Sequence, residues 1–101
     1  MNIETCNSLE QVRHAIDRID LQMLALLAER GGYVQQAARF KRTAADVPAP
    51  PRVEAVVAGI VNHARAIGAD PAVAEATWRA MIAAFIQSEL AAHANLHPPT
   101  T

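Results

Sequence analysis

The chain has 101 residues, of which 51% are hydrophobic, and its formal net charge is −1. This balance excludes the strongly basic surface that binding to nucleic acid or an anionic membrane requires, and the sequence has no run of about 18 apolar residues for a membrane span. The lone cysteine excludes an internal disulfide framework, and the N-terminus lacks the features of a signal peptide. We predict one cytoplasmic, all-α domain over residues 1–101, with an ordered core at about 8–95, because the abundant alanine favours helix.

A first helix is predicted to begin at about residue 9. Ser8 and Gln11 have capping-box spacing, and an apolar seam with steps of three and four follows them. No proline interrupts this pattern before Pro48, so the helix should have about 34 residues and a length of roughly 50 Å. The positions of the seam are Leu9, Val12, Ile16, Ile19, Met23, Leu26, Arg30, Tyr33, Ala37 and Phe40.

Gly31 and Gly32 oppose a continuous first helix, since each glycine costs about 1 kcal/mol relative to alanine in a helix interior. The alternative is two shorter helices that meet at this pair. The seam keeps its phase through both glycines, which favours one unbroken helix.

The segment VPAPPR at 47–52 breaks the chain, and a second helix should start near residue 50 and end at Gly68. Asp70 and Pro71 have the types expected for the N-cap and first residue of a third helix, which should continue to about His93 before a fraying end. Helices of roughly 18 and 24 residues cannot cover a 50 Å helix in a domain whose radius of gyration is only about 13 Å. A homodimer with long, intertwined helices is therefore expected.

Two cations interrupt the apolar seam. On a continuous helix, Arg30 and Lys41 would lie about 20° apart around the axis and some 16 Å apart along it, so both could reach one small anion. The alternative is that they extend to solvent or pair with acids such as Glu29 and Asp46. Arg13 would lie ~25 Å from Arg30 along the axis, too far to serve the same pocket in its own chain, but its copy in an antiparallel partner could reach it.

The third helix places a carboxyl group on an apolar stripe. Trp78, Ile82, Phe85 and Glu89 follow one another at steps of four, three and four, so Glu89 is predicted to face inward. Arg52 adds a further cation early in the second helix.

His93 and His97 have a spacing that could hold a metal ion. At a fraying, proline-terminated end, solvated histidines are the expectation instead, and we predict neither a metal nor a cofactor. Serine and cysteine residues lie without a plausible base, which disfavours a hydrolase triad.

Four segments of the chain together form a specific pattern: VRHAIDRID at 12–20, ER at 29–30, YVQQAARFK at 33–41 and VPAPPRV at 47–53. They resemble the type II, all-helical chorismate mutases, and most closely their isochorismate pyruvate lyase branch. The resemblance covers about residues 8–93 and implies an intertwined homodimer with two identical pockets, each of which holds one dicarboxylate substrate. The family's reactions are pericyclic and need neither a nucleophile nor a metal.

The resemblance also implies roles for the cations. Arg30 would bind a substrate carboxylate, and Arg13 would bind a carboxylate in the other subunit's pocket. Lys41 would donate to the ether oxygen and to a carboxylate, and Arg52 would come from the region that closes over the ligand. The candidate apolar walls are Val34, Ile82 and Phe85.

Glu89 departs from the family, which commonly has glutamine there as a donor to the ether oxygen. A carboxylate can only accept, so Glu89 would take this role when protonated. Lys41 would favour the charged form and burial the neutral form. Turnover is therefore predicted to rise as pH falls.

The start of the second helix bears on the substrate. Mutases of the family typically place acidic side chains there to hold the ring hydroxyl of chorismate, whereas the matching positions here are Ala49 and Val53. This favours isochorismate, with weak mutase activity alongside. A dedicated chorismate mutase is the first alternative, and a non-catalytic helical dimer that keeps the fold is the second.

Overall fold

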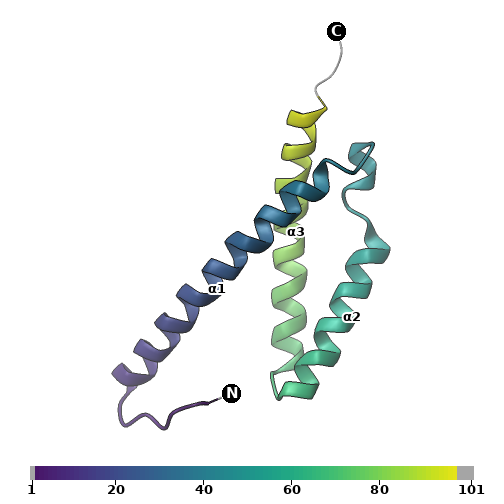
Figure 1. The fold of residues 1–101 in the computed structure, drawn as a ribbon. Coiled ribbons are helices and arrows are strands. Elements are labelled where there is room, and N and C mark those ends of the chain that lie inside the picture. Colours follow the sequence, from purple (N-terminus) through teal and green to yellow (C-terminus); the bar gives the residue numbers. More distant parts are fainter. Residues whose placement is uncertain (1, 98–101) are drawn as a thin grey trace. The chain divides into compact units, whose positions relative to one another are not determined.

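The computed structural model of the chain describes residues 2–97, and within this range it is helical without any strand (Figure 1). Its elements are α1 (Leu9–Ala38), the short 3-10 helix η1 (Ala44–Asp46), α2 (Pro50–Ile67) and α3 (Pro71–Leu96). The predicted all-α class, with one long and two shorter helices, is confirmed. The expected fraying of the C-terminal end falls on residues 98–101, outside the described residues.

The chain divides into two compact units, Met1–Gly32 and Tyr33–Thr101. The first unit contains most of α1, which begins at Leu9 as predicted. The Ser8 hydroxyl accepts a hydrogen bond from the Gln11 amide at 3.1 Å, and the Gln11 side chain accepts one from the Asn7 amide at 2.8 Å. The arrangement resembles a capping box, except that the Gln11 side chain accepts from the amide of Asn7 and not from that of Ser8. It satisfies the Gln11 amide of the first turn and the Asn7 amide that precedes the helix.

The helix passes through Gly31 and Gly32 without a break, so the alternative of two helices that meet there is wrong. The apolar seam of the first unit is exposed in the single chain, with Ile16 at 50% and Leu26 at 65% of full exposure. Hydrophobic side chains in such a continuous row usually mark a surface that another element covers.

The predicted end of α1 is wrong, because the helix stops at Ala38 and leaves Phe40 and Lys41 in the turn that follows. The amides of Arg39 and Phe40 bond to the carbonyl groups three residues earlier, as in a tightening last turn. The chain turns here, and Val47, which follows this turn, is only 2% exposed. The spacing predicted that Arg30 and Lys41 share one face of a continuous helix. This prediction is wrong, because Lys41 lies beyond the end of α1.

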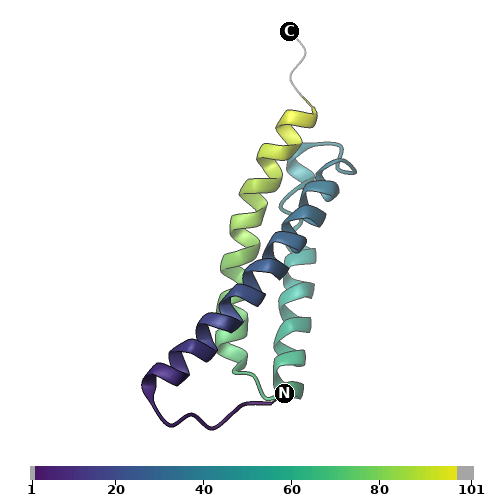
Figure 2. The same cartoon turned by 60° about the vertical axis from the view of Figure 1, so that its left-hand side comes forward.

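In the second unit, α2 and α3 run antiparallel and side by side (Figures 1 and 2). Their apolar contact includes the buried residues Val57, Ala64 and Ile82. On the surface, Arg79 of α3 forms a forked pair with Glu54 of α2 at 3.0 and 3.1 Å. Hydrogen bonding to Arg79 lowers the pKa of Glu54, although an exposed pair of this kind adds little to stability.

The turn between α2 and α3 follows the local signals of the sequence. Gly68 has φ of +79°, and its amide bonds to the Ala64 carbonyl as the C-terminal cap of α2. The Asp70 carboxylate then accepts from the amides of Ala72 at 2.9 Å and Val73 at 3.4 Å, as the N-cap of α3. The predicted boundaries at Gly68 and Pro71 are confirmed.

Two glycines of this unit provide a matched pair for a stability test. Gly68→Ala should lower the free energy of unfolding by about 1 kcal/mol, because an L side chain resists a positive φ. Gly59→Ala, in the interior of α2, should raise it by roughly 0.5–1 kcal/mol, since an added Cβ meets nothing within 4 Å. Chemical denaturation followed by circular dichroism measures both. Equal effects of the two variants would contradict this account of the turn.

Candidate active site

A largely buried ion pair joins the segment after α1 to the C-terminal third of α3. Lys41 Nζ lies 2.5 Å from Glu89 Oε2, and the two side chains are 26% and 8% exposed. Glu89 faces inward, as predicted from its place on the apolar stripe. Its Oε2 atom is buried and forms no hydrogen bond of standard geometry with any described residue, so the Lys41 ammonium is the group that balances its charge.

The remaining contacts of Lys41 fix its segment. Its ammonium also donates to the Val47 carbonyl at 3.4 Å, which closes the turn that contains η1. Asp46, the acid nearest in sequence, is used differently, because its carboxylate accepts from the Thr43 amide at 3.1 Å. The alternative that Lys41 pairs with an acid of its own chain is confirmed, but the acid is Glu89 of α3 and not Asp46.

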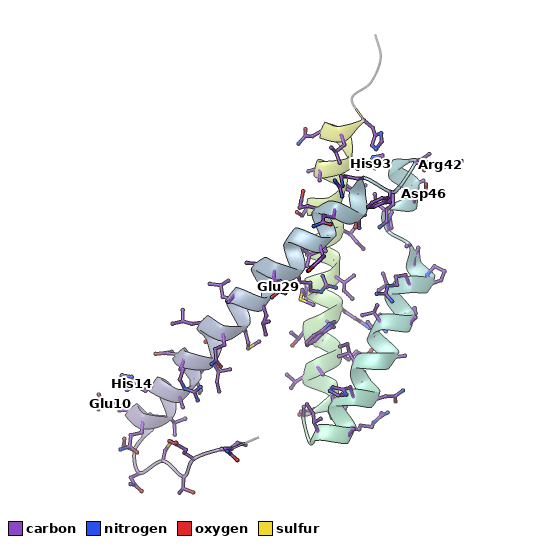
Figure 3. The ribbon with its side chains drawn as sticks, viewed as in Figure 1. Glu10, His14, Glu29, Arg42, Asp46 and His93 are labelled. Atoms are coloured by element: carbon purple, nitrogen blue, oxygen red, sulfur yellow. The ribbon has the colours of Figure 1, made fainter. Side chains whose placement is uncertain are left out.

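His93 is the neighbour that the sequence did not predict. It is 5% exposed, and its Nε2 lies 2.9 Å from the Lys41 carbonyl oxygen. Figure 3 shows His93 near the end of α3, beside the turn that carries Arg42 and Asp46. The expectation of a solvated histidine is wrong, because α3 continues to Leu96 and keeps residue 93 within a formed helix. One signal in the sequence could have predicted the burial of His93. It lies four residues after Glu89, and this spacing puts the two side chains on the same face of a helix.

The apolar residues predicted to line the pocket all lie in the second unit. Ile82 is buried on α3, seven residues before Glu89, and Phe85 of α3 and Val34 of α1 are half-buried. A hydrogen bond of 3.0 Å from Gln35 to Ser88 further ties the end of α1 to α3, beside Glu89. The end of α1 and α3, which carries Glu89, are thus joined by a hydrogen bond as well as by the Lys41–Glu89 pair.

The predicted arginines are distributed over both units. Arg52 is exposed in the first turn of α2, while Arg13 is exposed and Arg30 half-buried on the part of α1 that belongs to the first unit. Within the same unit, His14 and Glu10 come within 4.0 Å of each other at the start of α1 (Figure 3). A pocket shared by Arg13, Arg30 and Lys41 stays a prediction.

A hollow of about 360 Å³ occurs elsewhere in the second unit, and none of the predicted site residues lines it. It therefore does not correspond to the predicted substrate pocket. Its lining residues are Gln35, Gln36, Arg39, Ala92, Asn95 and Leu96.

Within residues 2–97, no three His, Cys, Asp or Glu side chains are grouped so that they could hold a metal ion. In the same range, no helix has the length and apolar character needed to cross a membrane.

Residues 12–90 match the family described as chorismate mutase type II, and the chain belongs to this family. A curated protein named isochorismate pyruvate lyase, from Pseudomonas aeruginosa, is 37% identical to it over 87 residues, which cover 86% of each chain. The chain is therefore similar to an enzyme of the isochorismate pyruvate lyase and chorismate mutase type.

Proposed function

We propose that this protein is an isochorismate pyruvate lyase, which converts isochorismate to salicylate and pyruvate, with weak chorismate mutase activity. The observation that carries the proposal is the Lys41–Glu89 ion pair. The Lys41 side chain is half-buried, and Glu89 is buried on the apolar stripe of α3. The similarity to the lyase of Pseudomonas aeruginosa supports the choice of reaction. Ala49 and Val53 support it further, because their side chains cannot hold the ring hydroxyl of chorismate.

Pericyclic bond breaking makes two demands on the protein. A flexible dianion must be held in its compact reactive shape, in which a ring hydrogen can move to the methylene carbon of the enolpyruvyl group as the C–O bond breaks. The charge that develops on the ether oxygen during this step must be stabilised. Bidentate contacts from Arg30, and Arg13 of the partner subunit, would meet the first demand, with Arg52 closing over the ligand. Lys41 would meet the second as a donor that is already in position.

The ion pair suits Lys41 to this task. An ammonium has three N–H donors, and Glu89 and the Val47 carbonyl engage it from two directions. A donor therefore remains for a substrate oxygen while the side chain is held. Ile82, Phe85 and Val34 would exclude water from the same space, which strengthens the electrostatic interaction.

The working form would be a homodimer in the cytoplasm, without a cofactor and without nucleic-acid or membrane partners. The exposed apolar seam of the first unit supports a second copy as its cover, because a row such as Ile16, Met23 and Leu26 is costly to leave in water. The net charge of −1 and the lone Cys6 agree with the rest of this description.

The alternatives differ in their products. A dedicated chorismate mutase would form prephenate, and a non-catalytic helical dimer would form nothing. Glu89 favours the second alternative to some extent, since the family commonly has glutamine at this position. The direct test is incubation of the purified protein with isochorismate and, separately, with chorismate.

Salicylate fluorescence should rise with isochorismate, and little prephenate should form from chorismate. The folded Lys41→Met variant should lose about 100-fold or more in salicylate formation, because a preorganised donor to the ether oxygen is removed. Prephenate as the main product would establish the mutase instead. Neither product from a folded, native protein would favour the non-catalytic dimer.

The pH dependence tests the role of Glu89. Only the protonated carboxyl can donate to the ether oxygen, but protonation also ends the ion pair that holds Lys41. The kcat should therefore rise as pH is lowered from about 8 to about 5 only where donation by Glu89 outweighs the loss of this pair. Two other ionisable groups lie in this region. Lys41 pairs with the Glu89 carboxyl, and His93 contacts the backbone carbonyl of Lys41. The Glu89→Gln variant donates at any pH, and its activity should extend to higher pH. A flat profile for the native protein over this range would contradict the assignment.

Subunit mixing tests the donation of Arg13. Arg13→Met and Arg30→Met should each lose about 100-fold or more in activity, since two charge-assisted hydrogen bonds are removed. Mixing equal amounts after unfolding and refolding should restore about one quarter of native activity, because half of the dimers are mixed and each has one complete pocket. Failure to recover activity, or a stable native monomer at assay concentration, would refute the shared pocket.

A further inference from the structure

We infer that His93 is a positioning residue that fixes Lys41 for the reaction, an inference that rests on the proposed function. A carbonyl oxygen can only accept, so the 2.9 Å contact with the Lys41 carbonyl requires a proton on Nε2 of His93. The histidine therefore donates this bond as the Nε2–H tautomer or as the imidazolium. This contact is partly buried, and loss of its donor would leave the Lys41 carbonyl without this bond.

Residue 41 is held at both its backbone and its side chain by one face of α3. Glu89 and His93 are four residues apart and are both buried. Glu89 takes the Lys41 ammonium, while His93 takes the carbonyl of the same residue. The two contacts come from successive turns of one helix. They therefore fix the position of the ammonium group in addition to balancing its charge.

The tether is needed because Lys41 has no helix of its own. It follows the last turn of α1, and its amide has only a long contact of 3.5 Å with the Ala38 carbonyl. The segment that follows is a short turn through η1. Without the histidine, the Lys41 backbone would keep few fixed points, and a displacement of about 1 Å at a reacting group can reduce turnover by about 100-fold.

His97 supports the orientation of the imidazole. The two rings have centroids 4.4 Å apart and are tilted by 32°, and the His97 amide donates to the His93 carbonyl at 2.9 Å. The ring of His93 is thus packed on one side and hydrogen-bonded at Nε2. This arrangement restricts its rotation, as a positioning role requires.

Three variants separate positioning from packing. His93→Leu keeps a side chain of similar volume without a donor, His93→Gln keeps a donor, and His63→Leu is a control on an exposed residue of α2. His93→Leu should lower kcat about tenfold and change KM less than about threefold, because a net hydrogen bond corresponds to roughly a 2- to 12-fold effect. His93→Gln should recover kcat to within about twofold of native, and His63→Leu should equal native.

Two outcomes would overturn the inference. Native kcat in a folded His93→Leu variant would show that Lys41 needs no tether. A loss in His93→Gln as large as in His93→Leu would show that packing, and not the hydrogen bond, is what residue 93 supplies. If His93→Leu does not fold, the inference is tested by kcat of the His93→Gln variant and by the protonation of His93 Nε2 in the native protein.

Readouts without substrate distinguish failure of this inference from failure of the proposed function. Nitrogen-15 NMR of the native protein should show a protonated Nε2 on His93. Hydrogen exchange of the Asp46 and Val47 amides, which are bonded within the turn, should be at least about fivefold faster in His93→Leu than in His63→Leu. An unprotonated Nε2, or unchanged exchange, overturns the tether. A native protein that forms neither salicylate nor prephenate refutes the proposed function, and the exchange result then stands as the test of the tether alone.

Discussion

The contact between Lys41 and Glu89 is the interaction on which the second unit depends. It joins the turn after α1 to the C-terminal third of α3, and it is largely withdrawn from water. Removal of one partner from such a pair typically costs about 3–5 kcal/mol, because the other charge is left without compensation. The pair therefore constrains where α1 may end and how the turn through η1 returns to α2. The pair is therefore a structural link between this turn and α3.

The boundaries of the helices were largely predictable because they depend on local chemistry. Ser8, Gly68, Asp70 and Pro71 each act through their own backbone conformation or through amides two or three residues away, and all four signals held. The end of α1 was not predictable in this way. Its apolar pattern continues to Phe40, but the burial of Val47 and the contacts of the next residue with α3 outweigh the local preference for helix.

The same distinction explains the candidate site. The inward direction of Glu89 follows from helical spacing, so it could be predicted from the sequence alone, whereas its proximity to Lys41 was expected only from the family resemblance. Asp46 is closer to Lys41 in sequence than Glu89 is, yet its carboxylate is used by the Thr43 amide. Proximity along the chain favours the wrong acid because only the packing of the turn against α3 decides which carboxylate reaches the ammonium. His93 was missed for a related reason, since its burial depends on how far α3 extends.

The composition of the core gives an independent reason to associate this face of α3 with function. Its buried apolar members are small or medium in size, including Ala38, Val57 and Ile82, and Glu89 and His93 are buried among the same elements. Apolar residues of similar volume would often make such a core at least as stable, because burying polar and charged groups carries a desolvation cost. A sequence selected for stability alone would have little reason to place a carboxylate and an imidazole on successive turns of its central helix. Both groups contact the same lysine, which indicates that the position of that lysine is what they serve.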